Sequence, residues 1–88
     1  MGKVGMSIRV GLEGPEVDAE KVLSEIRKKV RVYDSRIEPL AFGLNQIRLV
    51  VTADDKSGKG TDTYKIEAAI RSVHGVSDVE VESVTLVS

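Results

Sequence analysis

Few residues in this chain could perform acid–base or nucleophilic chemistry. His74 is the single histidine, and there is no cysteine. The surrounding pattern predicts that His74 lies at the end of a helix, where an imidazole suits the helix dipole. No nucleophile-elbow glycine pattern accompanies it. We therefore predict no catalytic residue and do not expect an enzyme.

Two short stretches look like ligand sites but lack the required spacing. Asp54 and Asp55 could bind a divalent cation, yet the sequence around them is not a calcium-binding loop. A solvated turn is the better interpretation. Residues 58–62, Gly-Lys-Gly-Thr-Asp, lack the spacing of a phosphate-binding P-loop, and a loop leading into a capped helix explains them. We expect no metal, no cofactor and no small-molecule substrate.

Charge and aromatic content argue against a nucleic-acid partner. The formal net charge is −1, whereas binding through phosphate contacts normally requires a basic excess. A sheet that binds RNA uses aromatic side chains on its central strands. The only aromatic residues here, Tyr33, Phe42 and Tyr64, fall outside the two strands predicted at the sheet centre.

Two charged clusters have simple structural interpretations. The basic residues 27–29 and Arg31 suit the C-terminal end of a helix. Asp78, Glu80 and Glu82 share one face of the last predicted strand. We interpret that face as solvated, with a docking surface for a basic partner as the alternative.

Alternating apolar residues predict four strands. The alternation is clear over residues 4–12 and 46–53. Residues 32–42 contain β-branched and aromatic residues typical of an extended segment. Residues 76–87 alternate too, but the phase changes near residues 82–83, which predicts a β-bulge there.

Helical spacing of apolar residues predicts two helices. Asp18 is a good N-cap for a helix that ends near Lys29. Thr61 or Asp62 could cap the second helix, which ends near His74. Gly75 would then be its C′ residue.

The order strand, helix, strand, strand, helix, strand is that of the split βαβ, ferredoxin-like arrangement. We predict an α+β fold in which a four-stranded antiparallel sheet carries both helices on one face. The other face remains open to water or to a partner. Eighty-eight residues, 41% hydrophobic and 31% charged, are enough for a single domain.

Folding alone does not explain residues 38–44, Glu-Pro-Leu-Ala-Phe-Gly-Leu. Pro39 indicates an edge strand or a bulge. The alanine, phenylalanine and glycine that follow are an unusual continuation of a strand. Phe42 could be a core anchor, or the stretch could present a rigid apolar contact surface to another protein.

These residues also carry a family resemblance. Residues 39–44, the strand after them, Asp54-Asp55, and Gly60-Thr61-Asp62 opening a helix resemble the elongation factor 1-beta family of guanine nucleotide exchange factors. The resemblance extends to residues 15–18 and 75–76, and so spans most of the chain. Archaeal members of that family are single small domains of this length.

The resemblance implies that residues 1–88 form one ferredoxin-like exchange domain. Such a domain promotes release of GDP from elongation factor 1-alpha, the GTPase that carries aminoacyl-tRNA to the ribosome. It would dock on this GTPase and destabilise the bound nucleotide and magnesium. Ile37 and Phe42 would flank the contact surface at the edge of the second strand, and the C-terminal end would lie near the nucleotide. The predicted partner-binding residues are Ile37, Pro39, Phe42, Gly43, Leu86, Val87 and Ser88.

Two positions depart from the family pattern. Eukaryotic members are similar in having a lysine close to the C-terminus, whereas this chain has no Lys or Arg after Arg71. Asn45 stands where relatives commonly have a basic residue. A mechanism based on that lysine cannot apply here as it stands.

Two other functions fit the same fold. One is a small-molecule-sensing module that dimerises through its sheet. The other is an acylphosphatase-like hydrolase, which needs an arginine in the anion-binding loop after the first strand. Residues 13–16, Glu-Gly-Pro-Glu, contain none, so the hydrolase is disfavoured.

The sequence also suggests a cellular location. The N-terminal residues lack the apolar run of a signal peptide. No stretch approaches the roughly 20 apolar residues of a membrane-spanning helix. We expect a cytoplasmic protein with no membrane contact.

Overall fold

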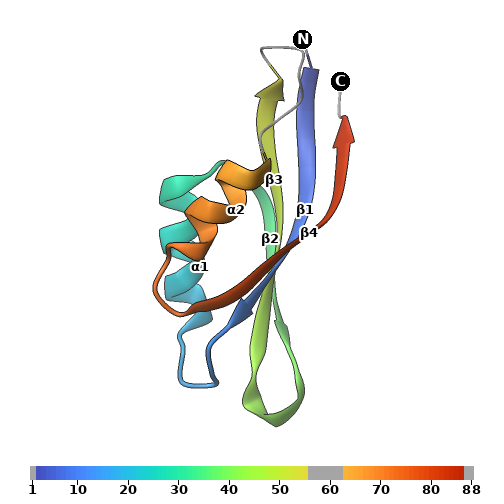
Figure 1. Ribbon diagram of the computed structural model, residues 1–88. Coiled ribbons are helices and arrows are strands. Elements are labelled where there is room, and N and C mark those ends of the chain that lie inside the picture. Colours follow the sequence, from blue (N-terminus) through green and yellow to red (C-terminus); the bar gives the residue numbers. More distant parts are fainter. Residues whose placement is uncertain (1, 56–62, 87–88) are drawn as a thin grey trace.

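The computed structural model describes residues 2–55 and 63–86, which form an antiparallel sheet of four strands with two helices on one face (Figure 1). The strand order is β2-β3-β1-β4, which confirms the predicted ferredoxin-like α+β fold. The two strands predicted to be central do lie at the centre. The elements in chain order are β1 (Gly2–Leu12), α1 (Ala19–Lys29), β2 (Val32–Pro39), a 3-10 turn (Ala41–Gly43), β3 (Asn45–Asp55), α2 (Thr63–Arg71) and β4 (Val76–Leu86).

Strand β1 organises the core because it pairs with both β3 and β4. Its apolar residues alternate with small or polar ones, so one face of the sheet is buried beneath the helices. Met6, Ile8 and Val10 are completely buried. The buried apolar residues are Val4, Met6, Ile8, Val10, Leu12, Ala19, Val22, Leu23, Ile26, Ile47, Leu49, Val51, Ile70, Val73 and Val79.

Helix α1 begins where the sequence predicts. The Asp18 carboxylate accepts hydrogen bonds from the backbone N–H groups of Glu20 (3.1 Å) and Lys21 (3.4 Å), which confirms Asp18 as the N-cap. The apolar face of the helix, including the fully buried Ile26, packs on the sheet. Within the described ranges, neither helix has the length and apolarity needed to cross a membrane.

The prediction that Asp54 and Asp55 lie in a loop is wrong. Both residues belong to β3, where Asp54 pairs with Lys3 and Asp55 with Gly2. The strand continues because β1 begins at Gly2 and supplies backbone partners to the end of β3. The rest of the predicted loop lies outside the described residues, as do the proposed helix caps Thr61 and Asp62.

The predicted role of Gly75 as a helix C′ residue is also wrong. Helix α2 ends at Arg71, and Gly75 lies in the turn before β4 with φ of 98°. A Cβ at Gly75 would lie 2.9 Å from the Val17 Cγ1 atom. Both the backbone conformation and the close contact therefore require glycine at this position.

The predicted bulge in β4 is confirmed. Ser7 faces Ser83 across the ladder, but the next residue, Ile8, faces Val81. Glu82 is therefore the additional residue on β4. The bulge explains why the apolar alternation of this strand changes phase.

Because β1 is central, truncation of one of its buried side chains should lower the free energy of unfolding substantially. Ile8→Ala should lower the free energy of unfolding by about 2–5 kcal/mol, because it leaves a cavity between β1 and the helices. Urea denaturation measures this loss. Val84→Ala, at a site on β4 that is 53% exposed, is the control and should cost less than about 1 kcal/mol. Equal losses in the two variants would contradict this description of the core.

Candidate functional site

The connection between β2 and β3 forms a short closed loop at one end of the sheet. Pro39 pairs with Asn45, so residues 40–44, hereafter the hairpin tip, complete the turn. The backbone N–H of Leu40 donates to the carbonyl oxygen of Leu44 at 2.6 Å, and that of Leu44 donates to Ala41 at 3.3 Å. These two bonds fix the path of the tip.

Phe42 occupies the outermost part of the hairpin tip. Its side chain is 94% exposed, and its backbone is left-handed, with φ of 62° and ψ of 31°. A left-handed backbone costs a residue with a side chain roughly 1–2 kcal/mol. The expectation that residues 32–42 are extended throughout is therefore wrong at its end, because β2 stops at Pro39. The alternative that Phe42 anchors the core is wrong as well.

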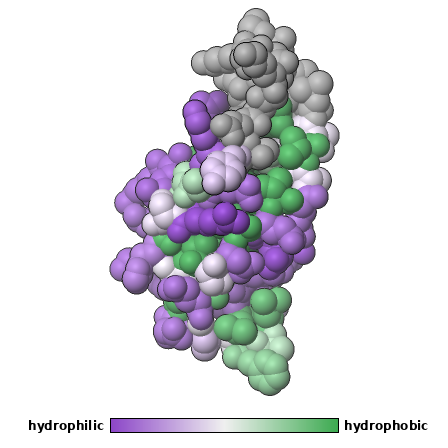
Figure 2. All heavy atoms as spheres, viewed as in Figure 1, coloured by the Kyte–Doolittle hydropathy of each residue, from purple (hydrophilic) through white to green (hydrophobic). Residues whose placement is uncertain are grey.

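Apolar surface gathers around Phe42. Leu40 is 47% exposed, and Ala41 is also exposed. Figure 2 shows apolar side chains at this end of the molecule, and Figure 1 shows that the hairpin extends beyond the helices. Nothing in the described part of the chain buries this surface. Such a grouping of exposed apolar residues is typical of a protein-binding site.

The structure brings only some of the predicted partner-binding residues together. Pro39, Phe42 and Gly43 lie at or beside the hairpin tip. Ile37 pairs with Ile47 in the sheet and packs, half-buried, against the core. Its position indicates a supporting role beneath the tip.

The C-terminal members of the predicted set lie elsewhere. Leu86 ends β4 and pairs with Val4, at the end of the sheet opposite the hairpin tip (Figure 1). Val87 and Ser88 are outside the described residues. The hairpin tip and the end of β4 are therefore two separate surfaces.

Two residues, Leu40 in the hairpin tip and Pro15 beside it, were not among the predicted contacts. Leu40 lies inside the stretch that the sequence singled out, and its exposure could not be read from its type. Pro15 belongs to the loop between β1 and α1, and its Cβ lies 3.7 Å from where a Cβ at Gly43 would be. No sequence pattern links Pro15 to Gly43, because the fold alone brings the two loops together.

The open face of the sheet is polar and contains a network of ion pairs. Arg48 on β3 bonds to Glu38 on β2 at 2.7 Å and to Glu82 on β4 at 2.5 Å. Arg9 on β1 lies 3.5 Å from Asp78 and 3.6 Å from Glu80. Of the three acidic residues predicted to share a face of β4, Asp78 and Glu80 thus lie beside Arg9 on the adjacent strand β1. Glu82 bonds to Arg48 on β3, which is one strand further away.

Glu38 is the best-bonded carboxylate of this network. It accepts hydrogen bonds from Gln46 Nε2 at 2.9 Å and from Arg48 Nε at 2.7 Å. These bonds hold the pKa of Glu38 below its ordinary value, the one from Gln46 having the larger effect. The same network raises the pKa of Arg48, chiefly through its bond to Glu38.

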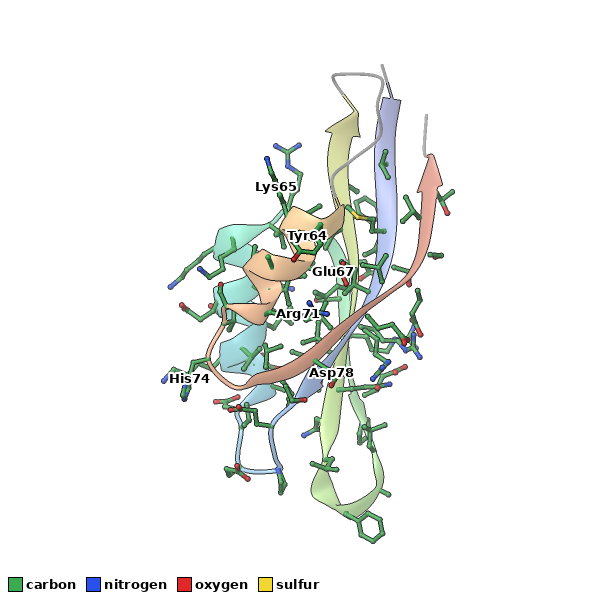
Figure 3. All side chains as sticks on the ribbon, in the orientation of Figure 1. Tyr64, Lys65, Glu67, Arg71, His74 and Asp78 are labelled. Atoms are coloured by element: carbon green, nitrogen blue, oxygen red, sulfur yellow. The ribbon has the colours of Figure 1, made fainter. Side chains whose placement is uncertain are left out.

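Residues with catalytic potential do not converge. Figure 3 shows His74 on the turn between α2 and β4, and Asp78 on β4. His74 is exposed, and no described residue forms a hydrogen bond to its ring. Among the described residues, no three His, Asp or Glu side chains are grouped so that they could hold a metal ion.

Comparison with known proteins gives a consistent family assignment. Residues 6–87 match the model of the EF-1 guanine nucleotide exchange domain. A protein of Archaeoglobus fulgidus named Elongation factor 1-beta is 40% identical over 90 residues, covering 98% of this chain and 99% of that protein. Proteins of the same name from Methanospirillum hungatei and Methanocorpusculum labreanum are 39% and 36% identical, covering 99% and 94% of this chain and 100% and 94% of their own lengths.

The backbone of the hairpin tip leads to a prediction about stability. Phe42→Asn should raise the free energy of unfolding by about 0.5–1 kcal/mol, since asparagine tolerates the left-handed conformation and the lost side chain is exposed. Gly43→Ala should lower it by about 1 kcal/mol, because φ there is 76°. Urea denaturation of both variants tests this. A destabilised Phe42→Asn would show that the aromatic ring supports the fold.

The lowered pKa of Glu38 predicts a pH dependence. A carboxyl with a pKa depressed by folding stabilises the protein above its unfolded pKa, and this contribution disappears as the pH falls through the folded value. Wild type should therefore lose stability as the pH falls below the ordinary Glu value of 4.5. Urea midpoints measured across this range should fall less steeply for Glu38→Gln.

The matched control for that measurement is Glu20→Gln, which removes an exposed carboxyl of α1 outside the network. The urea midpoint of Glu20→Gln should change with pH as steeply as that of wild type. If Glu38→Gln and Glu20→Gln have the same slope, Glu38 does not contribute in this way.

Proposed function

The chain belongs to the EF-1 guanine nucleotide exchange domain family, and from this premise we propose that it promotes release of GDP from elongation factor 1-alpha. Family membership supports a guanine nucleotide exchange role in translation elongation. The proposal extends this role to a specific partner, with residues 1–88 acting as one exchange domain in the cytoplasm.

The observation that supports docking on a protein is the exposed hairpin tip. Phe42 is 94% exposed in a strained backbone conformation that contributes nothing to the core. An aromatic side chain on a closed loop loses little conformational freedom on binding, so its burial by a partner is efficient. We assign the tip, with Phe42 and Leu40, as the anchor of the complex, and Pro39 lies beside it.

Exchange of this kind involves no bond-making chemistry in the factor. A factor accelerates release when it binds the nucleotide-free GTPase more tightly than the loaded form. An acceleration of about a thousandfold requires about 4 kcal/mol of differential binding in the transition state for release. A few buried apolar anchors with a polar rim can supply that amount.

The C-terminal end of β4 is the second proposed contact. Leu86, which ends β4 at the far end of the sheet from the tip, would lie near the nucleotide and magnesium of the GTPase. The proposed contact includes Val87 and Ser88, the next two residues in the sequence. No Lys or Arg follows Arg71 in this sequence, so the proposal does not include displacement of the magnesium by a C-terminal lysine.

The alternative function, a small-molecule sensor that dimerises through its sheet, is less well supported. Arg9 and Arg48 with their acidic partners occupy the open face. Burying these charges in a dimer would cost desolvation energy that the ion pairs already formed do not recover.

The decisive experiment compares two exposed aromatic residues. Phe42→Ala should lower the second-order rate constant for stimulated GDP release by about thirtyfold, which corresponds to about 2 kcal/mol of lost anchoring. Tyr33→Ala removes an aromatic that is 78% exposed on β2, away from the tip, and should change this constant by less than about twofold. Release of fluorescent GDP from elongation factor 1-alpha provides the measurement.

Both variants should keep their free energies of unfolding within about 0.5 kcal/mol of wild type, because both side chains are exposed. No acceleration by wild type, with an active GTPase, would refute the proposed function. Equal effects of the two variants would refute the assignment of Phe42 as the anchor.

A further inference from the structure

A second loop lies beside the hairpin tip and continues its surface. Residues 13–18 connect β1 to α1, and Pro15 in this loop is exposed next to Gly43. The two loops are distant in sequence but meet at the same end of the molecule. A partner that covers Phe42 from this side would therefore contact Pro15 as well.

The β1–α1 loop is held in place at several points. The backbone N–H of Glu13 donates to the carbonyl oxygen of Gly75 at 2.9 Å, and that of Val17 donates to Gly14 at 3.2 Å. Asp18 closes the loop by capping α1. Such a loop is preorganised, so little ordering entropy is lost when a partner binds to it.

An open hollow of about 760 Å³ begins at this loop and runs along α1 towards the α2–β4 turn. Its floor contains Val17, Val22 and Val73, and Lys21 and Lys29 line it along the helix. The loop end is acidic.

The acidic end of the hollow carries exposed carboxylates that are not in ion pairs with described residues. Glu13 and Glu16 are exposed there, and neither forms an ion pair with any described residue. This differs from the open face of the sheet, where each acid of β4 already has an arginine. An apolar floor with carboxylates at its end suits the aliphatic stem and charged head of a lysine or arginine side chain.

We infer that the docking surface of the hairpin tip continues through Pro15 to Glu13 and Glu16, where it receives a basic side chain of the same GTPase. The inference rests on the proposed function. The GTPase surface that would fit this site has an apolar pocket for Phe42 and a cationic group on the rim of that pocket. The apolar part supplies affinity, and the carboxylates steer association and set the orientation of the bound partner.

The test compares two charge reversals of equal size. Glu16→Lys should weaken binding to nucleotide-free elongation factor 1-alpha about tenfold at about 50 mM salt, and by less than about twofold at about 500 mM, because salt screens exposed charges. Asp34→Lys makes the same charge change on β2, away from both loops, and should leave the Kd within about twofold of wild type. Fluorescence anisotropy with labelled factor measures the Kd.

Two further variants separate charge from packing and from misfolding. Glu16→Gln removes the charge with little change of shape, and should weaken binding about threefold with the same dependence on salt. Pro15→Ala removes apolar contact only, and its effect of about twofold to threefold should not depend on salt. Circular dichroism verifies that each variant is folded.

The possible outcomes distinguish the inference from the function on which it rests. If Glu16→Lys and Asp34→Lys bind alike at low salt, the inference is overturned while exchange by wild type stands. If wild type binds without accelerating GDP release, the proposed function fails, but the charge comparison still decides whether this surface contacts the GTPase. If wild type does not bind at all, both are overturned.

Discussion

The pairing of β1 with strands on both of its sides is the constraint on which the remaining structure depends. Val4, Met6, Ile8 and Val10 must all point to one face, because a shift by one residue would expose every one of them. The register of β3 and β4 follows from this requirement. The bulge at Glu82 then allows β4 to continue in the sheet although its apolar residues change phase.

The same constraint creates the hairpin tip. Ile37 and Ile47 must face the core together, so β2 pairs with β3 as far as Pro39 and Asn45. The few residues between them have to reverse the chain beyond the helix layer, where no core exists to bury them. Phe42 and Leu40 are therefore exposed as a consequence of the register, and the left-handed conformation at Phe42 comes from the closure of a short turn.

The sequence predicted features that depend on local periodicity. The order of the elements along the chain, the N-cap at Asp18 and the bulge in β4 all follow from spacing and residue type, and all are confirmed. The sequence failed where distant residues decide the outcome. Asp54 and Asp55 have turn-like composition, but β1 holds them in a strand. Gly75 resembles a helix terminus, yet it lies in the turn before β4, where a Cβ would come within 2.9 Å of Val17. The proximity of Pro15 to Gly43 could not be predicted from any local pattern, because the fold alone brings the two loops together.

Stability and proposed binding are thus assigned to different parts of the molecule. The buried face of β1 and its neighbours supplies the folding energy, while the hairpin tip contributes strain and exposed apolar area. A rigid sheet fixes the separation between this tip and the far end of β4, since continuous ladders join them. For the proposed exchange reaction this rigidity has a consequence. If both proposed contacts form, a factor that cannot adjust the distance between them would bind well only to the GTPase conformation that matches it. On this proposal, that selectivity would be the source of the differential affinity that nucleotide release requires.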